Sequence, residues 1–348
     1  MTKQAELIKA FDTLGKVMLS IGQSKPWGGY ELGVTEEEYQ LLVSNVKRQF
    51  QWNGWFTETA VLHVFKSWGE QLTVEQLTTF ASQYKWAESP KRVGVIMAGN
   101  IPLVGFHDFL CVLLSGNKIT AKLSSDDKTL LPSLVQMLIK FYPPLEEYIT
   151  IALAKLGEVD AIIATGSGNT MRYFESYFGH LPHLFRKNRT SVAVLTGNES
   201  KEELIALGSD IFTHYGLGCR NVSQLLLPQD FDLNRFFESV ISYGDIVNHH
   251  KYANNYDYNK AIYLMNLEQI LDNGFVLLKE SNELFSPLAM LFYHRYQDIS
   301  EVNDYLDSRK DDIQAVVGQN YLPFGTAQCP QLADYADGVD TMRWLEGI

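Results

Sequence analysis

Short apolar runs alternate with stretches of helical periodicity from residue 93 onward, and this alternation constrains the fold more than any other feature of the chain. A short apolar run bounded by turn residues predicts a strand that is buried on both faces. Strands connected by helices favour a parallel sheet covered by helices, so the sequence predicts the α/β class. The predicted strands are 93–97, 118–123, 161–164, 192–195, 223–227, 262–265 and 288–292, and the predicted helices are 103–115, 127–142, 169–178 and 200–215.

Residues 1–89 are predicted to be helical. Apolar residues recur at helical spacing from Leu7 to Met18, and Thr35 with Glu38 forms the signature of a capping box. Four tryptophans of this region are interpreted as large anchors of helix packing, namely Trp52, Trp55, Trp68 and Trp86.

The balance of charge excludes several classes of function. The 348 residues are typical of two packed domains, and 41 acidic against 29 basic residues give a net charge of −12. Such a surface repels phosphate backbones, so nucleic-acid binding is not expected. An anionic substrate would require a local basic pocket.

The beginning of the chain and its cysteines predict a cytoplasmic protein. Charged residues interrupt the apolar positions of residues 1–20, which is typical of an amphipathic helix and not of a signal peptide. The apolar runs are too short to span a membrane. Cys111, Cys219 and Cys329 are an odd number without metal-ligand spacing, which fits a reducing compartment.

A glycine-containing turn follows the strand predicted at 161–164. Thr165-Gly166-Ser167-Gly168 leads into a predicted helix, and backbone amides at such a turn can approach a phosphate. Met171 stands where the dinucleotide fingerprint has its third glycine. The segment alone leaves a phosphate site and an entry turn without a ligand equally open.

Cys219 is the strongest candidate nucleophile. Gly218 precedes it and Arg220 follows it, which places the thiol in a loop beside a positive charge that favours the thiolate. A loop cysteine without a catalytic role is the commoner alternative, and Cys111, inside an apolar run, is interpreted as a core residue. His214 is either a Cys/His partner or a capping or surface histidine.

Asn100 and Lys122 each have a structural and a functional interpretation. Asn100 follows the first predicted strand and is either a turn residue or an amide donor toward an oxyanion. Lys122 ends the second strand and is either a solvated strand end or a contact to a phosphate or ribose. Two histidine pairs lack partners at metal spacing, so no metal site is predicted: His180 with His183, and His249 with His250.

Five segments together resemble the aldehyde dehydrogenase superfamily. They are GVIMAGNIPL (94–103), SGNKITAKLSS (115–125), IIATGSG (162–168), FTHYGLGCRN (212–221) and ELFSPL (283–288). In the family's order, they are similar to a strand ending at Asn-x-Pro, an Ala-Gly-Asn…Lys stretch, a Phe-Thr-Gly-Ser turn, the Gly-x-x-Cys of the nucleophile and Glu-Ile-Phe-Gly-Pro. The resemblance implies an aldehyde-dehydrogenase-like fold, with a parallel-sheet cofactor domain and an α/β catalytic domain.

Within this superfamily, the ending FGTAQCPQLADYADGVDTMRWL (324–345) resembles the LuxC-like acyl-CoA reductases, which reduce fatty acyl thioesters to aldehydes. Hydrolytic dehydrogenases carry a general-base Glu shortly after the Thr-Gly-Ser turn, whereas residues 178–192 contain neither Asp nor Glu. Without that base, water is not activated against an acyl-enzyme. The resemblance therefore implies NAD(P)H-dependent reduction of a fatty acyl-CoA to an aldehyde.

The resemblance also assigns roles to individual residues. Cys219 attacks the acyl-CoA carbonyl, expels CoA and carries the acyl thioester, while Asn100 and the Cys219 amide hold the oxyanion. The implied cofactor contacts are Lys122 at the adenosine ribose, Gly166 and Ser167 at the pyrophosphate with Thr165 beside them, Glu283 at the nicotinamide ribose and Phe285 at the ring.

Two departures from the family bear on cofactor and substrate. Ser125 stands where many NAD-using relatives have Glu, which removes a repulsion against a 2′-phosphate and favours NADPH over NADH, although Asp126 adjoins it. Gly99 replaces the family's usual aromatic residue, which predicts additional room beside Asn100 for a long acyl chain. No metal is implied.

The predicted domains are a helical N-terminal region (1–89), a nicotinamide-cofactor domain (90–211), a catalytic domain (212–320) and a C-terminal segment that packs back (321–348), with the active site between the two α/β domains. Relatives imply a homodimer or larger and, in luminous bacteria, an acyl-protein synthetase partner. The alternatives are an NAD-linked aldehyde dehydrogenase that forms acid, a Cys-dependent acyltransferase or thioesterase, and a non-catalytic subunit. The reductase ranks first.

Overall fold

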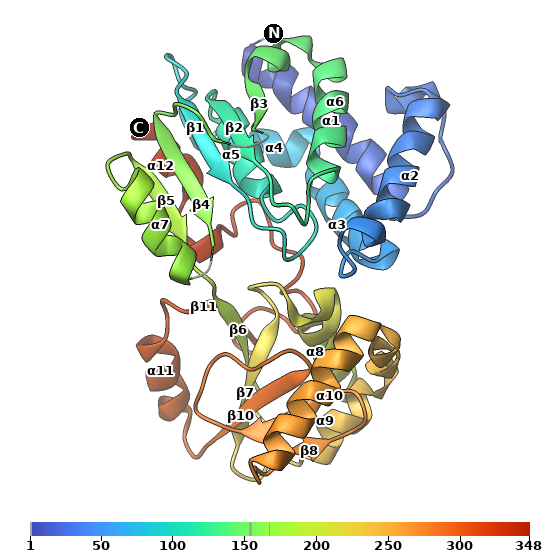
Figure 1. Ribbon diagram of the computed structural model, residues 1–348, viewed down its shortest axis with the longest axis vertical. Helices are drawn as coiled ribbons and strands as arrows, with labels where there is room; N and C mark the ends of the chain where they lie inside the picture. The colour runs from blue at the N-terminus through green and yellow to red at the C-terminus, as the bar shows by residue number, and fades with distance from the viewer. Residues whose placement is uncertain (1, 153–154, 167) are drawn as a thin grey trace. The chain divides into compact units, whose positions relative to one another are not determined.

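The computed structural model describes residues 2–152, 155–166 and 168–348. The chain forms two compact units (Figure 1). Unit 1 comprises Met1–Asn188 with Gln331–Ile348, and unit 2 comprises Arg189–Pro330. The chain therefore passes into unit 2 after residue 188 and returns after residue 330, whereas the functional domain boundaries at 89, 211 and 320 stay predictions.

Unit 1 begins with a group of amphipathic helices. They are α1 (Lys3–Gly22), the 3-10 helix η1 (Tyr30–Leu32), α2 (Glu36–Trp52), α3 (Glu58–Gln71) and α4 (Val74–Ala81). Thr35 accepts a hydrogen bond from the Glu38 amide while the Glu38 side chain accepts one from the Thr35 amide, so the predicted capping box is confirmed. Phe11 of α1 and Phe65 of α3 are fully buried in the same core, which binds these helices together.

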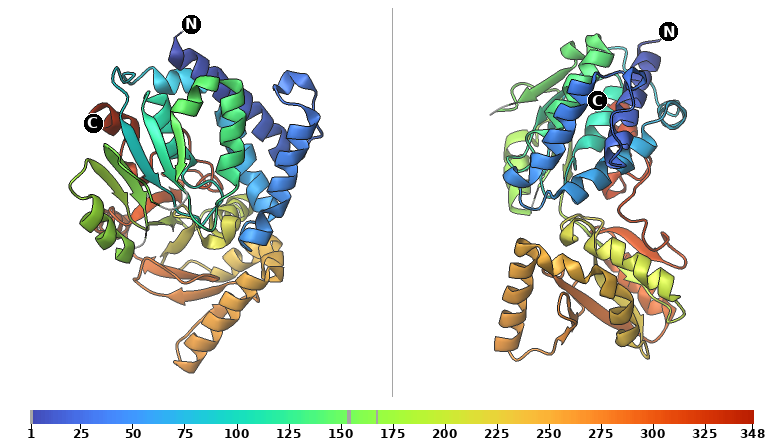
Figure 2. Two further views of the ribbon diagram at one scale, coloured as in Figure 1. Left: turned by 45° about the horizontal axis from the view of Figure 1, so that its top comes forward. Right: turned by 90° about the vertical axis from the view of Figure 1, so that its right-hand side faces the viewer.

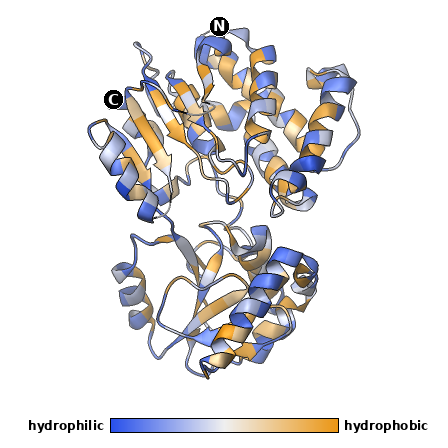
Figure 3. Ribbon diagram, viewed as in Figure 1, coloured by the Kyte–Doolittle hydropathy of each residue, from blue (hydrophilic) through white to orange (hydrophobic). Residues whose placement is uncertain are grey.

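A parallel sheet, sheet A, forms the centre of unit 1, and its described strands run in the order β3-β2-β1-β4-β5. The strands are β1 (Arg92–Ile96), β2 (Lys118–Lys122), β3 (Ile149–Ala152), β4 (Ala161–Thr165) and β5 (His183–Arg186). The connecting helices are α5 (Phe106–Leu114), α6 (Leu130–Phe141), η2 (Pro143–Glu147) and α7 (Gly168–Phe178). Figure 3 shows apolar residues along these strands, which follows from their burial between helices.

The two faces of sheet A pack against different helices. Val93 and Ile119 belong to the core that includes α1, α5 and α6. Ile162 and Ala164 pack on the opposite side with Phe174 of α7. Because β1 lies between β2 and β4, the order of the strands reverses at β1, and ligands of α/β proteins bind at the carboxyl edge beside such a reversal.

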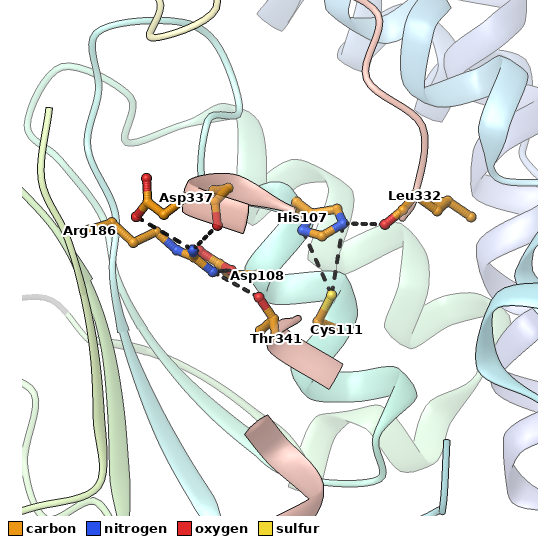
Figure 4. Close-up of polar contacts among 8 residues, drawn as sticks. His107, Asp108, Cys111, Arg186, Leu332, Asp337 and Thr341 are labelled. Carbon is orange, nitrogen blue, oxygen red and sulfur yellow. Dashed lines mark hydrogen bonds and ion pairs between the residues drawn. The ribbon is translucent and has the colours of Figure 1, made fainter. Parts of the chain in front are cut away.

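A buried arginine fastens the C-terminal segment 331–348 to the rest of unit 1 (Figure 4). Arg186 of β5 is 4 % exposed, and one terminal nitrogen donates to Asp108 and to Thr341, each at 2.8 Å. The other terminal nitrogen donates to the Ala336 carbonyl at 2.8 Å. The segment contains η5 (Ala336–Gly338) and α12 (Thr341–Glu346).

Unit 2 is built on sheet B, whose described strands run in the order β11-β6-β7-β10-β9-β8. The strands are β6 (Thr190–Val194), β7 (Val222–Pro228), β8 (Leu271–Asp272), β9 (Leu277–Glu280), β10 (Met290–Tyr296) and β11 (Ile313–Gly318). The helices are α8 (Lys201–Phe212), η3 (Thr213–Gly216), α9 (Leu233–Val240), η4 (Ile241–Asn248), α10 (His250–Met265) and α11 (Ile299–Ser308). β8 pairs antiparallel with β9, and the other pairs are parallel. Helices α8 and α9 cover one face and α11 the other, while α10 projects from the rest of unit 2 (Figure 2).

Five of the predicted strands are confirmed within two residues at each end, and one predicted strand is wrong. The confirmed strands are β1, β2, β4, β6 and β7. Residues 262–265 form the last turn of α10, whose N-cap is His249. A short apolar run does not by itself distinguish a strand from a helix, and most side chains of this run are exposed, so no second layer selects a strand.

The tryptophans do not all serve the same role. Trp55, Trp68 and Trp86 pack against the core of unit 1, as predicted. Trp52 is 54 % exposed, so its interpretation as a packing anchor is wrong. In the part of the chain that the structure describes, no helix combines the length and the apolar character needed to cross a membrane.

Candidate active site

The predicted site residues fall into two sets, one in each unit. Unit 1 contains Asn100, Lys122, Thr165 and Gly166, and unit 2 contains Cys219, Glu283 and Phe285. Ser167, predicted at the pyrophosphate, lies outside the described residues.

The structure brings the unit 1 set together at the carboxyl edge of sheet A. Lys122 is the last residue of β2 and pairs with Ile96, the last residue of β1. Ile96 also pairs with Ala164, which precedes Thr165 at the end of β4. Asn100 follows the end of β1 by a few residues, and β1 lies between β2 and β4. The loop of Asn100 therefore leaves the sheet between the ends of β2 and β4. This is the edge at which a nucleotide binds in doubly wound folds.

The loop that carries Asn100, residues 99–103, is fixed by two buried side chains that the sequence did not single out. Asn53, at the end of α2, donates from its amide to the Gly99 carbonyl at 3.3 Å. Asp127 accepts the Leu103 amide at 2.7 Å, and Leu103 has a positive φ of 55°. A residue held in this conformation needs support from its surroundings, and Asp127 supplies it.

The carboxyl group of Asp127 is in an unusual environment. The residue is 7 % exposed, and burial raises its pKa to about 6 although the Leu103 hydrogen bond opposes the shift. Its second carboxylate oxygen is buried without a hydrogen-bond partner among the described residues. Asp127 therefore carries an electrostatic cost that its hydrogen bond to the Asn100 loop only partly offsets.

The room predicted beside Gly99 is filled. A Cβ at this position would lie 2.5 Å from the Ser124 hydroxyl oxygen and 3.0 Å from the Asp126 Cβ. Glycine is required here because the loop after β2 packs directly on the loop after β1. The expectation of extra space for an acyl chain at Gly99 is therefore wrong.

Gly166 is also constrained by packing. A Cβ there would lie 3.0 Å from Thr170 and 3.1 Å from the Phe174 ring, so α7 packs closely on the turn. The Gly166 amide donates to the Arg186 carbonyl at 3.1 Å, which extends the ladder between β4 and β5. An anion at this turn would consequently be bound by amides further along, at the start of α7.

In unit 2, Cys219 follows a strained turn. His214, Tyr215 and Gly216 have consecutive positive φ values of 54°, 60° and 80°. Two of these residues carry side chains, and each left-handed residue other than glycine costs about 1 kcal/mol or more. Strain of this kind persists where the surroundings fix the backbone, and it concentrates at functional sites.

Asn221 is the residue that fixes the loop of Cys219, residues 217–221. It is 2 % exposed, and its side-chain oxygen accepts the Gly218 amide at 2.8 Å. Its amide nitrogen donates to three carbonyls at the end of α8 and in η3, those of Asp210 (3.1 Å), Ile211 (3.0 Å) and Thr213 (2.7 Å). The neutral side chain of Asn221 thus provides hydrogen-bond partners both for carbonyls at the end of α8 and for the amide of Gly218, the residue before the candidate nucleophile.

Further contacts hold Cys219 itself and Tyr215 of the turn before it. The Ser191 hydroxyl donates to the Cys219 carbonyl at 3.2 Å. The Tyr215 ring lies 4.4 Å from the His249 ring, at the N-terminus of α10. His214 is 7 % exposed, which excludes the surface position among its alternatives, whereas its role as a Cys/His partner stays a hypothesis. Cys219 itself is half-buried, whereas Cys111 is fully buried in the core, as predicted.

The segment of Glu283 and Phe285 adjoins the strand that follows Cys219. The Ser223 hydroxyl of β7 donates to the Leu284 carbonyl at 2.7 Å. The Glu283 amide donates to the Ser281 hydroxyl at 3.1 Å, and the Phe285 side chain is 49 % exposed. Unit 2 therefore brings its three predicted residues onto two neighbouring loops.

A pocket lies between these two loops within unit 2. Its walls include Tyr215 and Gly216 from the turn before Cys219, and Ser286 and Leu288 from the segment after Phe285. Among the described residues, no group of three or more His, Cys, Asp or Glu side chains is arranged to hold a metal ion.

Comparison with known proteins identifies the fold. Neither a protein-family model nor a curated protein sequence matches the chain. A mutant of the indole-3-acetaldehyde dehydrogenase AldA of P. syringae, in complex with NAD+ and IAA, matches with a TM-score of 0.64 and 13 % identity over 89 % of this chain and 71 % of its own. An aldehyde dehydrogenase of Mycobacterium tuberculosis complexed with NAD+ matches with a TM-score of 0.62 and 14 % identity, covering 91 % of this chain and 73 % of its own.

Lactaldehyde dehydrogenase of Escherichia coli gives a third match, with a TM-score of 0.64 and 10 % identity over 91 % of this chain and 74 % of its own. These similarities extend over both units. The predicted α/β class is confirmed, and the chain has the aldehyde dehydrogenase fold.

Proposed function

We propose that this protein is a nicotinamide-dependent oxidoreductase that reduces an acyl-CoA thioester to an aldehyde through the thiol of Cys219. The observation that carries the proposal is the loop of Cys219, which Asn221 and Ser191 hold beside the segment of Glu283 and Phe285 in an aldehyde dehydrogenase fold. Backbone strain of this kind clusters at functional sites, which supports a chemical role for the neighbouring cysteine.

The carboxyl edge of sheet A suits a nicotinamide dinucleotide. Lys122 and Thr165 would contact it there, and the amides of Gly168 and Asn169 at the start of α7 would bind its phosphates. Glu283 and Phe285 of unit 2 would contact the nicotinamide half. When bound, the reduced cofactor supplies a hydride to the acyl carbon. Ser125, which replaces a carboxylate, favours NADPH.

The chain's own residues account for the remaining chemistry. The Cys219 thiolate, favoured by the adjacent Arg220, attacks the thioester carbonyl and forms a carbon–sulfur bond. Collapse of the tetrahedral species breaks the bond to the CoA sulfur, which leaves as a thiol after taking up a proton. After reduction, the hemithioacetal on Cys219 breaks down to the aldehyde and the free thiol.

Asn100 and the Cys219 amide are the proposed donors to the oxyanion of both tetrahedral species. Each such donor contributes about 3 kcal/mol to catalysis in comparable enzymes. The Asn53 and Asp127 contacts to residues 99–103 would keep the Asn100 amide in position.

The direction of the reaction rests on the segment 178–192, which contains neither Asp nor Glu. It comprises the end of α7, β5 and the start of β6. A dehydrogenase that forms an acid needs a base to activate water against its acyl-enzyme. A reductase that starts from a thioester is protected from hydrolysis when that base is absent.

The second candidate is an NAD-linked aldehyde dehydrogenase that oxidises an aldehyde to an acid. The similarity to dehydrogenases solved with NAD+ favours it. This candidate requires a base outside 178–192, and it predicts acid as the product.

The test follows both directions with the same protein. Wild type and Cys219→Ala are incubated with acyl-CoAs of increasing chain length and either NADPH or NADH, and then with aldehydes and NAD+ or NADP+. We expect oxidation of NADPH, one aldehyde and one free CoA per turnover, and no reaction in the variant. Acid from aldehyde and NAD+, without reduction of any acyl-CoA, would establish the second candidate instead. An acyl adduct on Cys219 without cofactor turnover would indicate an acyltransferase.

A further inference from the structure

An exposed tryptophan marks a site that neither the fold nor the proposed chemistry explains. Trp52 is the last residue of α2 and is 54 % exposed, although indole burial is a large source of stability and four other tryptophans of the helical region pack on the core. A single exposed apolar side chain is common on a protein surface, so the groups around Trp52 decide whether it marks a site.

The surroundings of Trp52 are basic. The Lys128 ammonium nitrogen lies 4.3 Å from the centroid of the Trp52 ring. Arg48 precedes Trp52 by one helical turn, which places both on the same side of α2. Lys47 is the sequence neighbour of Arg48, and the side chains of Lys47, Arg48 and Lys128 are all exposed. Within the described residues, none of them forms a salt bridge. We call these four residues the Trp52 cluster.

The acidic groups nearest to Lys128 in the sequence do not neutralise the cluster by ion pairing. Asp127 directs one carboxylate oxygen to the Leu103 amide and buries the other. Asp126 is exposed, so the two carboxylates contribute two negative charges against three positive ones at neutral pH. In a chain with a net charge of −12, this is a local basic site of the kind an anionic substrate requires.

The Trp52 cluster adjoins the candidate active site of unit 1. Gln49, one turn before the end of α2, donates to the Thr129 hydroxyl at 2.8 Å. Asn53 donates to the Gly99 carbonyl at 3.3 Å. The end of α2 is therefore bonded to both loops at the carboxyl edge of sheet A, the one that carries Asn100 and the one that follows Lys122.

We infer that the Trp52 cluster binds the phosphorylated adenosine of coenzyme A, the leaving group of the thioester; this inference rests on the function proposed above. The indole offers a face on which adenine stacks, and ammonium and guanidinium groups bind phosphates. NADPH contains the same chemistry, an adenosine with an additional ribose phosphate. Lys122 and Thr165 already serve that cofactor in the proposed function, which leaves the Trp52 cluster for the CoA nucleotide.

Binding without turnover tests the site directly. Isothermal titration calorimetry with CoA, dephospho-CoA and NADPH compares wild type with Trp52→Ala, Lys128→Ala and Arg48→Ala. We expect CoA to bind about tenfold more weakly to each variant, in line with the contribution of one stacked base or one charge-assisted contact. Dephospho-CoA should discriminate less between wild type and the two cation variants, because it lacks the ribose phosphate.

Two matched controls separate the site from general effects. Tyr30→Ala removes another exposed aromatic ring of unit 1, which is 76 % exposed. Lys201→Ala makes the same change in net charge at an exposed lysine of unit 2. Both should bind CoA with the wild-type affinity. Thermal unfolding of every variant identifies any that does not fold.

Kinetics separate this inference from the proposed function. We expect the ratio of kcat/KM for an acyl-CoA to that for the matching acyl-pantetheine to fall about tenfold in Trp52→Ala, because the shorter thioester lacks the nucleotide. An unchanged CoA affinity in folded variants, or weaker binding of NADPH instead of CoA, would overturn the inference and leave the reductase standing. CoA binding that the variants weaken, in a protein that reduces no thioester, would support the cluster and reject the reductase.

Discussion

The loop of Asn100 in unit 1 and the loop of Cys219 in unit 2 are both fixed by buried polar side chains, but over different distances along the chain. Side chains 46 and 24 residues away hold the Asn100 loop, and one of them is a carboxylate. Asn221 holds the Cys219 loop from three residues away with a neutral amide. The Asn100 loop therefore depends on how unit 1 packs and on the ionisation of Asp127. The Cys219 loop, in contrast, is held mainly by hydrogen bonds of Asn221, one of its own residues.

The largest expected effect comes from breaking a long-range contact of unit 1. Arg186→Ala leaves Asp108 buried without its cation, which should lower the free energy of unfolding by about 3–5 kcal/mol. Urea unfolding measures the change. A double-mutant cycle with Asp108→Asn should show strong coupling, and an Arg186→Ala protein with the wild-type stability would contradict the assigned role of this contact.

Asn221→Ala tests the self-contained loop. The change leaves the Gly218 amide and three carbonyls without their partner, and we expect a loss of about 3 kcal/mol in unfolding free energy. Because Gly218 adjoins Cys219, acyl transfer to Cys219 should slow by at least about a hundredfold. Intact-mass kinetics of acylation measure this step.

Asn221→Asp serves as the isosteric control. It retains the acceptor for Gly218 but loses the donor to the carbonyls, so its acylation rate should exceed that of Asn221→Ala while its stability stays low. If both variants acylate at the wild-type rate, the loop does not depend on Asn221.

The comparison also predicts a dependence on pH. Burial raises the pKa of Asp127 from 3.8 to about 6, so folding favours its protonated form. This contribution to stability is complete below about pH 4 and is lost as the pH rises to about 6, by roughly 2–3 kcal/mol in total. Asp127→Asn, which keeps an acceptor for Leu103, should remove this loss.

Asp210 of unit 2 provides the matched measurement. Its pKa is also raised to about 6 by burial; its carboxylate accepts the amides of Gly325 and Ala327, and its main-chain carbonyl accepts the side-chain amide of Asn221. Asp210→Asn should flatten the pH dependence of stability by a similar amount. If the stability profile of either Asn variant between pH 4 and 6 equals that of wild type, the corresponding carboxyl does not titrate there.

The difference between local and long-range contacts also explains which features could be predicted from the sequence. β1, β2 and β4 are apolar runs buried on both faces, so their pattern identifies them, whereas the edge strands β3 and β5 are short and half-exposed and give no such pattern. Asn100 and Cys219 could be located because loops after or before strands are visible in a sequence. Asn53 and Asp127 could not, because their partners are backbone groups that only tertiary packing brings to them.

The sequence gives little indication that Asn221 fixes the Cys219 loop. It stands inside the segment FTHYGLGCRN, two residues after the cysteine, but a single asparagine between a loop and a strand is most often a turn residue. What distinguishes it is its burial with all its hydrogen-bonding groups satisfied, and burial of one polar residue cannot be inferred from its neighbours in sequence.

The smallest expected effects concern one glycine in each loop region, and they sharpen the contrast because the two glycines are needed for different reasons. Gly99→Ala places a Cβ 2.5 Å from the Ser124 hydroxyl, so the loops must separate, and we expect a loss of about 1–3 kcal/mol that Ser124→Gly partly restores. At Gly216 the nearest atom would lie 3.7 Å away, but φ is +80°, so Gly216→Ala should cost only about 1 kcal/mol for its backbone conformation. No distant substitution should rescue it. Chemical denaturation of Gly99→Ala, Gly99→Ala/Ser124→Gly and Gly216→Ala measures these costs, and a loss at Gly216→Ala as large as that at Gly99→Ala would show that the turn before Cys219 is limited by its neighbours as well.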